Sequence, residues 1–129
     1  MERDQPTNQK KAGQMDASAA GKLGLEEIVH IANKVGLDYV DAKKKADHMS
    51  LIRPTVKARV MLRLDDGSTS ESKLQRLAET DEEYVSFLEQ MTETKREAER
   101  LKVRYESYKN LFEARRSQLS YQKAEMKLI

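Results

Sequence analysis

The C-terminal half of the chain contains no residue that should interrupt a helix, because neither glycine nor proline occurs after Gly67. Along this half, one set of positions recurs at alternating steps of three and four residues, a spacing that places side chains on one face of an α-helix. This C-terminal stripe comprises Tyr84, Phe87, Met91, Thr94, Ala98, Leu101, Tyr105, Tyr108, Phe112, Arg115, Leu119, Gln122, Met126 and Ile129. Its length of more than six heptads is typical of a helix that packs along other helices.

An earlier helical pattern offers a partner for part of this stripe. Apolar residues recur at helical spacing from Leu25 and continue approximately to Val60. A helix over residues 80–129 extends roughly 70 Å, so the first pattern can fold back along only part of it. We therefore predict an all-α protein, a helical hairpin whose long C-terminal helix also drives oligomerisation. The residues expected at the contact between copies are Leu101, Tyr105, Tyr108, Phe112, Arg115, Leu119 and Met126.

Four segments follow from composition and turn signals. Residues 1–23 are polar and nearly free of bulky apolar side chains, which predicts a flexible tail. Residues 24–66 form the first helical region, residues 67–79 a turn and short helix, and residues 80–129 the long helix. Two capping boxes, Ser68 with Glu71 and Thr80 with Glu83, are predicted to start the last two helices.

Three features leave the first helical region ambiguous. Gly36 weakens a helix and allows a break there. Pro54 removes a backbone donor, so it should kink the helix or start a new one. The stretch from Val56 to Leu64 alternates apolar and basic residues, which fits a strand, but it also fits a helix. We favour the helix because nothing else in the chain offers a strand partner.

The charges are segregated although the net charge is only +2. The basic segment, residues 42–64, has seven bases and one acid, whereas the acidic segment, residues 79–93, has six acids and no base. Phosphates are the commonest target of a surface with few neutralising acids. The residues predicted to contact nucleic acid are Lys57, Arg59, Arg63, Arg53, Lys43, Lys44 and Lys45.

Catalytic signatures are missing from the sequence. His30 and His48 are the only histidines, they have no ligand spacing, and the chain has no cysteine and no phosphate-binding glycine loop. We therefore expect a non-enzymatic protein without metal or cofactor. The sequence also lacks an apolar run of membrane-spanning length and the apolar core of a signal peptide, so we expect no membrane partner and a cytoplasmic location.

The order of elements resembles that of UvsY-like recombination mediators of large tailed phages. A lysine-bearing helix leads into Lys57-Ala58-Arg59-Val60, then the turn Asp65-Asp66-Gly67, a short helix and a long C-terminal helix; the resemblance covers roughly residues 41–129. It implies an oligomer in the host cytoplasm that binds single-stranded DNA, with a recombinase and a single-strand-binding protein as partners. It also implies DNA contacts for Lys57 and Arg59.

Other functions fit the same sequence. The basic segment is also compatible with an ordinary solvated face. The coiled-coil pattern is compatible with a structural or adaptor protein, such as a virion or assembly component, that does not bind nucleic acid. The acidic segment would also suit an inhibitor that docks on a basic surface. Single-stranded DNA binding is our leading expectation, and the structural or adaptor role is its main alternative.

Overall fold

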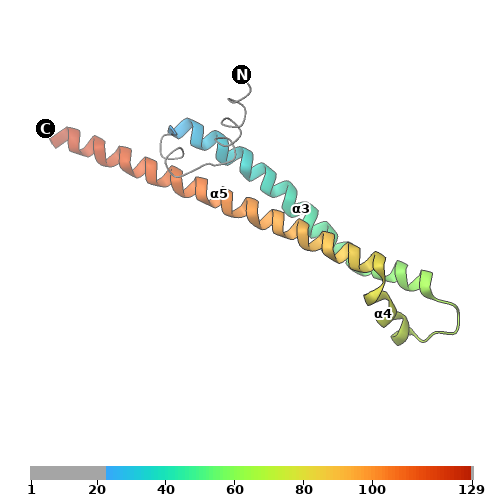
Figure 1. The fold of residues 1–129 in the computed structure, drawn as a ribbon. Helices are drawn as coiled ribbons and strands as arrows, with labels where there is room; N and C mark the ends of the chain where they lie inside the picture. The colour runs from blue at the N-terminus through green and yellow to red at the C-terminus, as the bar shows by residue number, and fades with distance from the viewer. Residues whose placement is uncertain (1–22, 129) are drawn as a thin grey trace, which may run out of the picture. The chain divides into compact units, whose positions relative to one another are not determined.

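The computed structural model describes residues 23–128 and contains three helices: α3 (Leu25–Leu64), α4 (Glu71–Thr80) and α5 (Glu82–Leu128) (Figure 1). No strand occurs within these residues, so the all-helical prediction is confirmed. The strand alternative for residues 56–64 is wrong. Val56 and Val60, one helical turn apart, are both buried, and this face carries the core. The predicted flexible tail lies almost entirely outside the described residues.

Helix α3 is continuous through both of its expected weak points. It contains Pro54 within its length, so of the two effects expected of this proline, a kink or a new helix start, the new start is wrong. A proline at this position leaves the carbonyl of Ser50 without its helical donor. Ser50 and Pro54 are both on the exposed side of the helix, where water can take the place of that donor. Gly36 likewise lies inside the helix.

The starts of α4 and α5 differ from the predicted capping boxes. The N-cap of α4 is Ser70, whose side chain accepts a hydrogen bond from the backbone N–H of Lys73 at 3.3 Å. Asp81 ends α4, and its carboxylate accepts from the N–H of Glu83 at 3.0 Å at the start of α5. The Thr80 hydroxyl instead donates to the carbonyl of Leu77 at 3.2 Å. The observed N-caps therefore lie two residues after the predicted Ser68 and one residue after the predicted Thr80.

The described residues fall into two compact units, one formed by residues 32–107 and the other by residues 23–31 and 108–128. In the first of these, α3 and α5 run antiparallel. A Cβ on Gly36 would lie 2.9 Å from the ring of Tyr105, and the Ser50 hydroxyl lies 3.9 Å from the sulfur of Met91. Fourteen residues forward along α3 therefore correspond to fourteen residues back along α5.

The core of residues 32–107 includes all three helices. Val56 and Val60 of α3, Ala78 of α4 and Tyr84 of α5 form one buried cluster. Val60 and Ala78 are fully buried, so α4 closes over the end of the α3–α5 pair. Partly buried side chains pack around this cluster, namely Ile52, Met61, Leu64, Phe87 and Leu88. Apolar burial of this kind is the main driving force for the fold.

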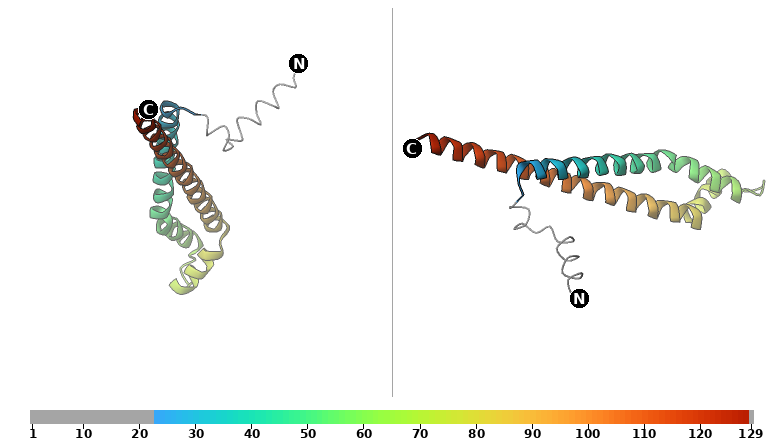
Figure 2. Two further views of the ribbon diagram at one scale, coloured as in Figure 1. Left: turned by 90° about the vertical axis from the view of Figure 1, so that its left-hand side faces the viewer. Right: turned by 90° about the horizontal axis from the view of Figure 1, so that it is seen from above.

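The other unit joins the first turns of α3 to the second half of α5. Ile28 is fully buried and Tyr108 nearly so. Phe112 and Arg115 are half-buried, whereas every residue from 116 to 128 is exposed. Figures 1 and 2 show the first turns of α3 beside α5. Within this unit, α3 therefore covers α5 as far as Arg115 and no further.

Candidate functional site

Three of the bases predicted to contact nucleic acid are held in ion pairs. Lys57 Nζ lies 3.0 Å from Glu79 Oε1, and Arg59 Nη2 lies 2.9 Å from Glu83 Oε2. Arg63 Nη2 lies 2.6 Å from Asp81 Oδ2 and 3.5 Å from Glu83 Oε1. The bases come from the last turns of α3, and the acids from the end of α4 and the start of α5.

This arrangement cancels the charge of the basic segment where it was expected to act. Three bases face three acids, so this end of the unit carries no excess positive charge from these six residues. The hydrogen bond from Arg63 holds the pKa of the Asp81 carboxyl below its usual value and raises the pKa of the Arg63 guanidinium. The acidic segment, 16 residues or more beyond the bases in sequence, neutralises them across the turn.

The remaining predicted bases have fewer partners. Lys43 pairs with Asp47 at 2.9 Å, and their hydrogen bond raises the pKa of the Lys43 ammonium. Lys44, Lys45 and Arg53 are exposed, and they make no ion pair with any residue in the described range 23–128. The unpaired positive charge available to a polyanion therefore lies along the middle of α3.

The residues predicted to mediate oligomerisation divide into two groups. Leu101 and Tyr105 are half-buried within residues 32–107, and Tyr108 is buried while Phe112 and Arg115 are half-buried within the other unit. These five side chains are thus largely covered within the chain itself. The other two are exposed: Leu119 retains 50 % of its accessible surface and Met126 retains 74 %.

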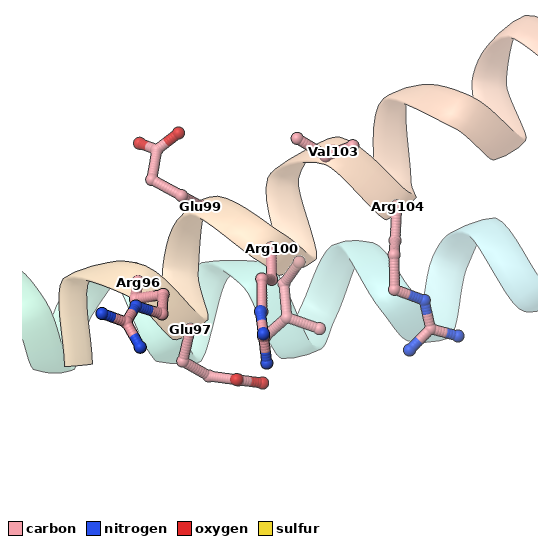
Figure 3. A pocket seen from close by; sticks show the side chains of 7 residues that line it. Arg96, Glu97, Glu99, Arg100, Val103 and Arg104 are labelled. Carbon is pink, nitrogen blue, oxygen red and sulfur yellow. The ribbon is translucent and has the colours of Figure 1, made fainter. Parts of the chain in front are cut away.

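A row of arginines on α5 was missed at the sequence level. Arg96, Arg100 and Arg104 line a shallow pocket and extend toward the same side of the helix (Figure 3). All three are exposed, and Arg96 pairs with Glu93 at 3.0 Å. The signal that would have found them is the spacing of four residues, which places side chains on one helix face.

The described residues contain neither a candidate metal centre nor a candidate membrane span. No group of three or more His, Asp or Glu side chains in the described part of the chain is arranged to hold a metal ion. Within the same residues, no helix combines the length and low charge that crossing a membrane requires.

Comparison with protein families, curated proteins and solved structures gave no match. The resemblance to phage recombination mediators therefore stays a prediction.

Proposed function

We propose that this chain is a non-catalytic assembly or adaptor protein that acts through self-association of its helices. The supporting observation is that α3 covers the C-terminal stripe only as far as Arg115. The stripe continues uncovered through Leu119 and Met126 with unchanged spacing. Burial of apolar surface lowers the free energy by about 25 cal/mol for each Å² removed from water, which favours association through this stripe.

A helical partner suits this surface better than a small ligand. The exposed end of α5, residues 116–128, presents a convex face with apolar positions at helical spacing, which is the form that packs into another helix. Gln122 lies on the same stripe. A single polar residue in such a position favours one register over others.

Light scattering on a sizing column, over a series of protein concentrations, tests this proposal. For the native chain, we expect the measured mass to rise with concentration. For Leu119→Ser/Met126→Ser, we expect the mass of a monomer at every concentration. The matched control is Leu37→Ser/Leu51→Ser, which replaces two leucines of α3 that are 67 % and 77 % exposed; this variant should associate normally. A native chain that remains monomeric at every concentration would overturn the proposal.

Single-stranded DNA binding is the second candidate function, and Lys44, Lys45 and Arg53 support it. These bases are exposed and unpaired within the described residues, so phosphates can reach them without displacing an acid. Binding of this type releases counterions and weakens steeply as salt rises. If the chain has this function, the resemblance to recombination mediators implies a recombinase and a single-strand-binding protein as its partners.

Fluorescence anisotropy with labelled oligo-dT at several salt concentrations tests the second candidate. Lys44→Gln/Lys45→Gln/Arg53→Gln should weaken binding at least about tenfold and reduce the salt dependence. Lys57→Gln/Arg59→Gln/Arg63→Gln is the control with the same loss of charge, and its effect should be smaller because those bases are already paired. Absence of salt-dependent binding by the native chain would exclude this function.

A further inference from the structure

A second exposed surface on α5 carries acids beside apolar side chains. Its lining residues, here called the acidic groove, are Val85, Leu88, Glu89, Thr92 and Glu93. Val85 is 37 % exposed and Leu88 is half-buried. Glu89 makes no ion pair with any residue in the described range, and Glu93 has only the exposed contact with Arg96. The groove is therefore a shallow apolar surface with an acidic edge.

The exposed end of α5 has the same layout with the opposite charge. Lys123 and Lys127 follow Leu119 by four and eight residues, just as Glu89 and Glu93 follow Val85. A spacing of four advances about 40° around the helix, so both pairs of charges lie on the same flank of their apolar residue. Both lysines are exposed and have no ion-pair partner within residues 23–128.

Both surfaces lie on α5, where Glu93 and Lys123 are separated by 30 residues in sequence. We propose that the exposed end of α5 in one copy docks antiparallel on the acidic groove of a second copy. Lys123 and Lys127 then pair with Glu93 and Glu89, and Met126 packs toward the apolar side of the groove.

The α3–α5 pair shows why an antiparallel docking fits the charges. Arg59 and Glu83 each precede a buried residue by one position, Val60 and Tyr84, and they pair across the antiparallel helices. Equivalent flanks of two stripes therefore meet when the helices run in opposite directions. By the same geometry, the acids that follow Val85 face the bases that follow Leu119.

Two properties of the assembly follow from this contact. The contact joins two different surfaces, so a pair held by one such contact leaves one copy with a free groove and the other with a free helix end. A short helical end buries less than the roughly 1,200–2,000 Å² of a standard stable interface. We therefore expect weak, concentration-dependent association that salt weakens further. This inference rests on the proposed self-association and names the surfaces that carry it.

Reciprocal charge reversal in the full-length chain tests the contact. The acidic-end variant is Lys123→Glu/Lys127→Glu, and the basic-groove variant is Glu89→Lys/Glu93→Lys. Each variant alone brings like charges together, so its self-association should weaken at least about tenfold. An equimolar mixture should regain association at low salt, because each variant then offers the surface that the other lacks. Sedimentation velocity measures all three samples, and circular dichroism checks that each variant keeps its helix content.

The outcomes separate this inference from the broader proposal. Lys44→Glu/Lys45→Glu is the control with the same change of charge, and it should associate as the native chain does. Native-like association of the basic-groove variant alone would overturn the groove contact while leaving self-association intact. Failure of the mixture to associate would also overturn it. A native chain that never self-associates would overturn both the contact and the proposed function.

Discussion

Gly36 of α3 lies directly against the ring of Tyr105 on α5. A Cβ added at Gly36 would lie 2.9 Å from Cε1 and 3.2 Å from Cδ1 of this tyrosine. Carbon atoms in ordinary contact are about 3.5–4.0 Å apart, so a larger residue does not fit without movement. The glycine that was expected to weaken α3 instead allows α3 and α5 to approach closely.

Gly36→Ala should therefore destabilise the protein. On an open helix face, alanine in place of glycine would stabilise by about 1 kcal/mol. Here we expect the free energy of unfolding to fall by about 1–3 kcal/mol, because the ring of Tyr105 must move. Urea denaturation measures the change. In a Tyr105→Leu background, Gly36→Ala should cost less or become stabilising, and an equal cost in both backgrounds would contradict the contact.

Val60→Ala tests the three-helix core. Val60 is fully buried among α3, α4 and α5 side chains. Its truncation should lower the free energy of unfolding by about 2–3 kcal/mol through lost burial and a residual cavity. Leu62→Ala, two residues further on the same helix, removes a side chain that is 79 % exposed and should change stability by less than about 0.5 kcal/mol. Similar losses of stability from the two substitutions would contradict the finding that α3 buries Val60 and exposes Leu62.

Removal of acids should reveal whether the paired bases can bind phosphate. Glu79→Gln/Glu83→Gln leaves Lys57 and Arg59 without their carboxylate partners. If the chain binds single-stranded DNA, this variant should bind oligo-dT several-fold more tightly at low salt, since more positive charge is free. Glu26→Gln/Glu27→Gln changes the net charge equally at the other end of α3 and serves as the control. Equal affinity of the two variants would show that the pairs do not mask a DNA surface.

Asp66, in the turn between α3 and α4, should make the stability of the protein depend on pH in acid. The Asp66 carboxylate accepts hydrogen bonds from the backbone N–H of Ser68 at 2.9 Å and from the hydroxyl of Thr69 at 2.8 Å. These bonds lower the pKa of Asp66 from 3.8 to about 2, with the backbone bond from Ser68 as the largest cause.

A lowered folded-state pKa stabilises the ionised form of Asp66. Its contribution is therefore complete above the unfolded value of 3.8 and is lost as pH falls toward about 2. Asp66→Asn should remove this part of the acid-dependent decrease in Tm while changing little else. Thermal unfolding between about pH 2 and 6 measures the difference. An identical decrease in both proteins would show that Asp66 does not contribute.

The main elements of the fold could be predicted because their signals are local. The C-terminal stripe and the lack of breakers after Gly67 are visible in the sequence, and α5 runs to Leu128. The effects of Gly36 and Pro54 could not be read locally. A glycine opposite Tyr105 and a proline on an exposed face are both tolerated for reasons that lie in the packing of α3.

The candidate site was harder to predict, because its chemistry depends on pairs far apart in sequence. The clusters of charge are visible in the sequence, but counting acids within the basic segment missed those that reach it across the turn. Arg63 lies 18 residues before Asp81, yet their side chains are 2.6 Å apart. The burial of Leu101 to Arg115 likewise depends on where α3 begins against α5, which periodicity alone does not determine.

Hydrogen–deuterium exchange at low and high protein concentration tests the central claim most directly, because it locates any contact between copies. We predict that amides in residues 116–128 exchange rapidly in the dilute protein and gain protection as concentration rises, together with those in residues 85–93. Amides in residues 98–112 should change little, since α3 already covers that part of α5. Unchanged exchange in residues 116–128 at concentrations where the mass has risen would contradict self-association through the end of α5.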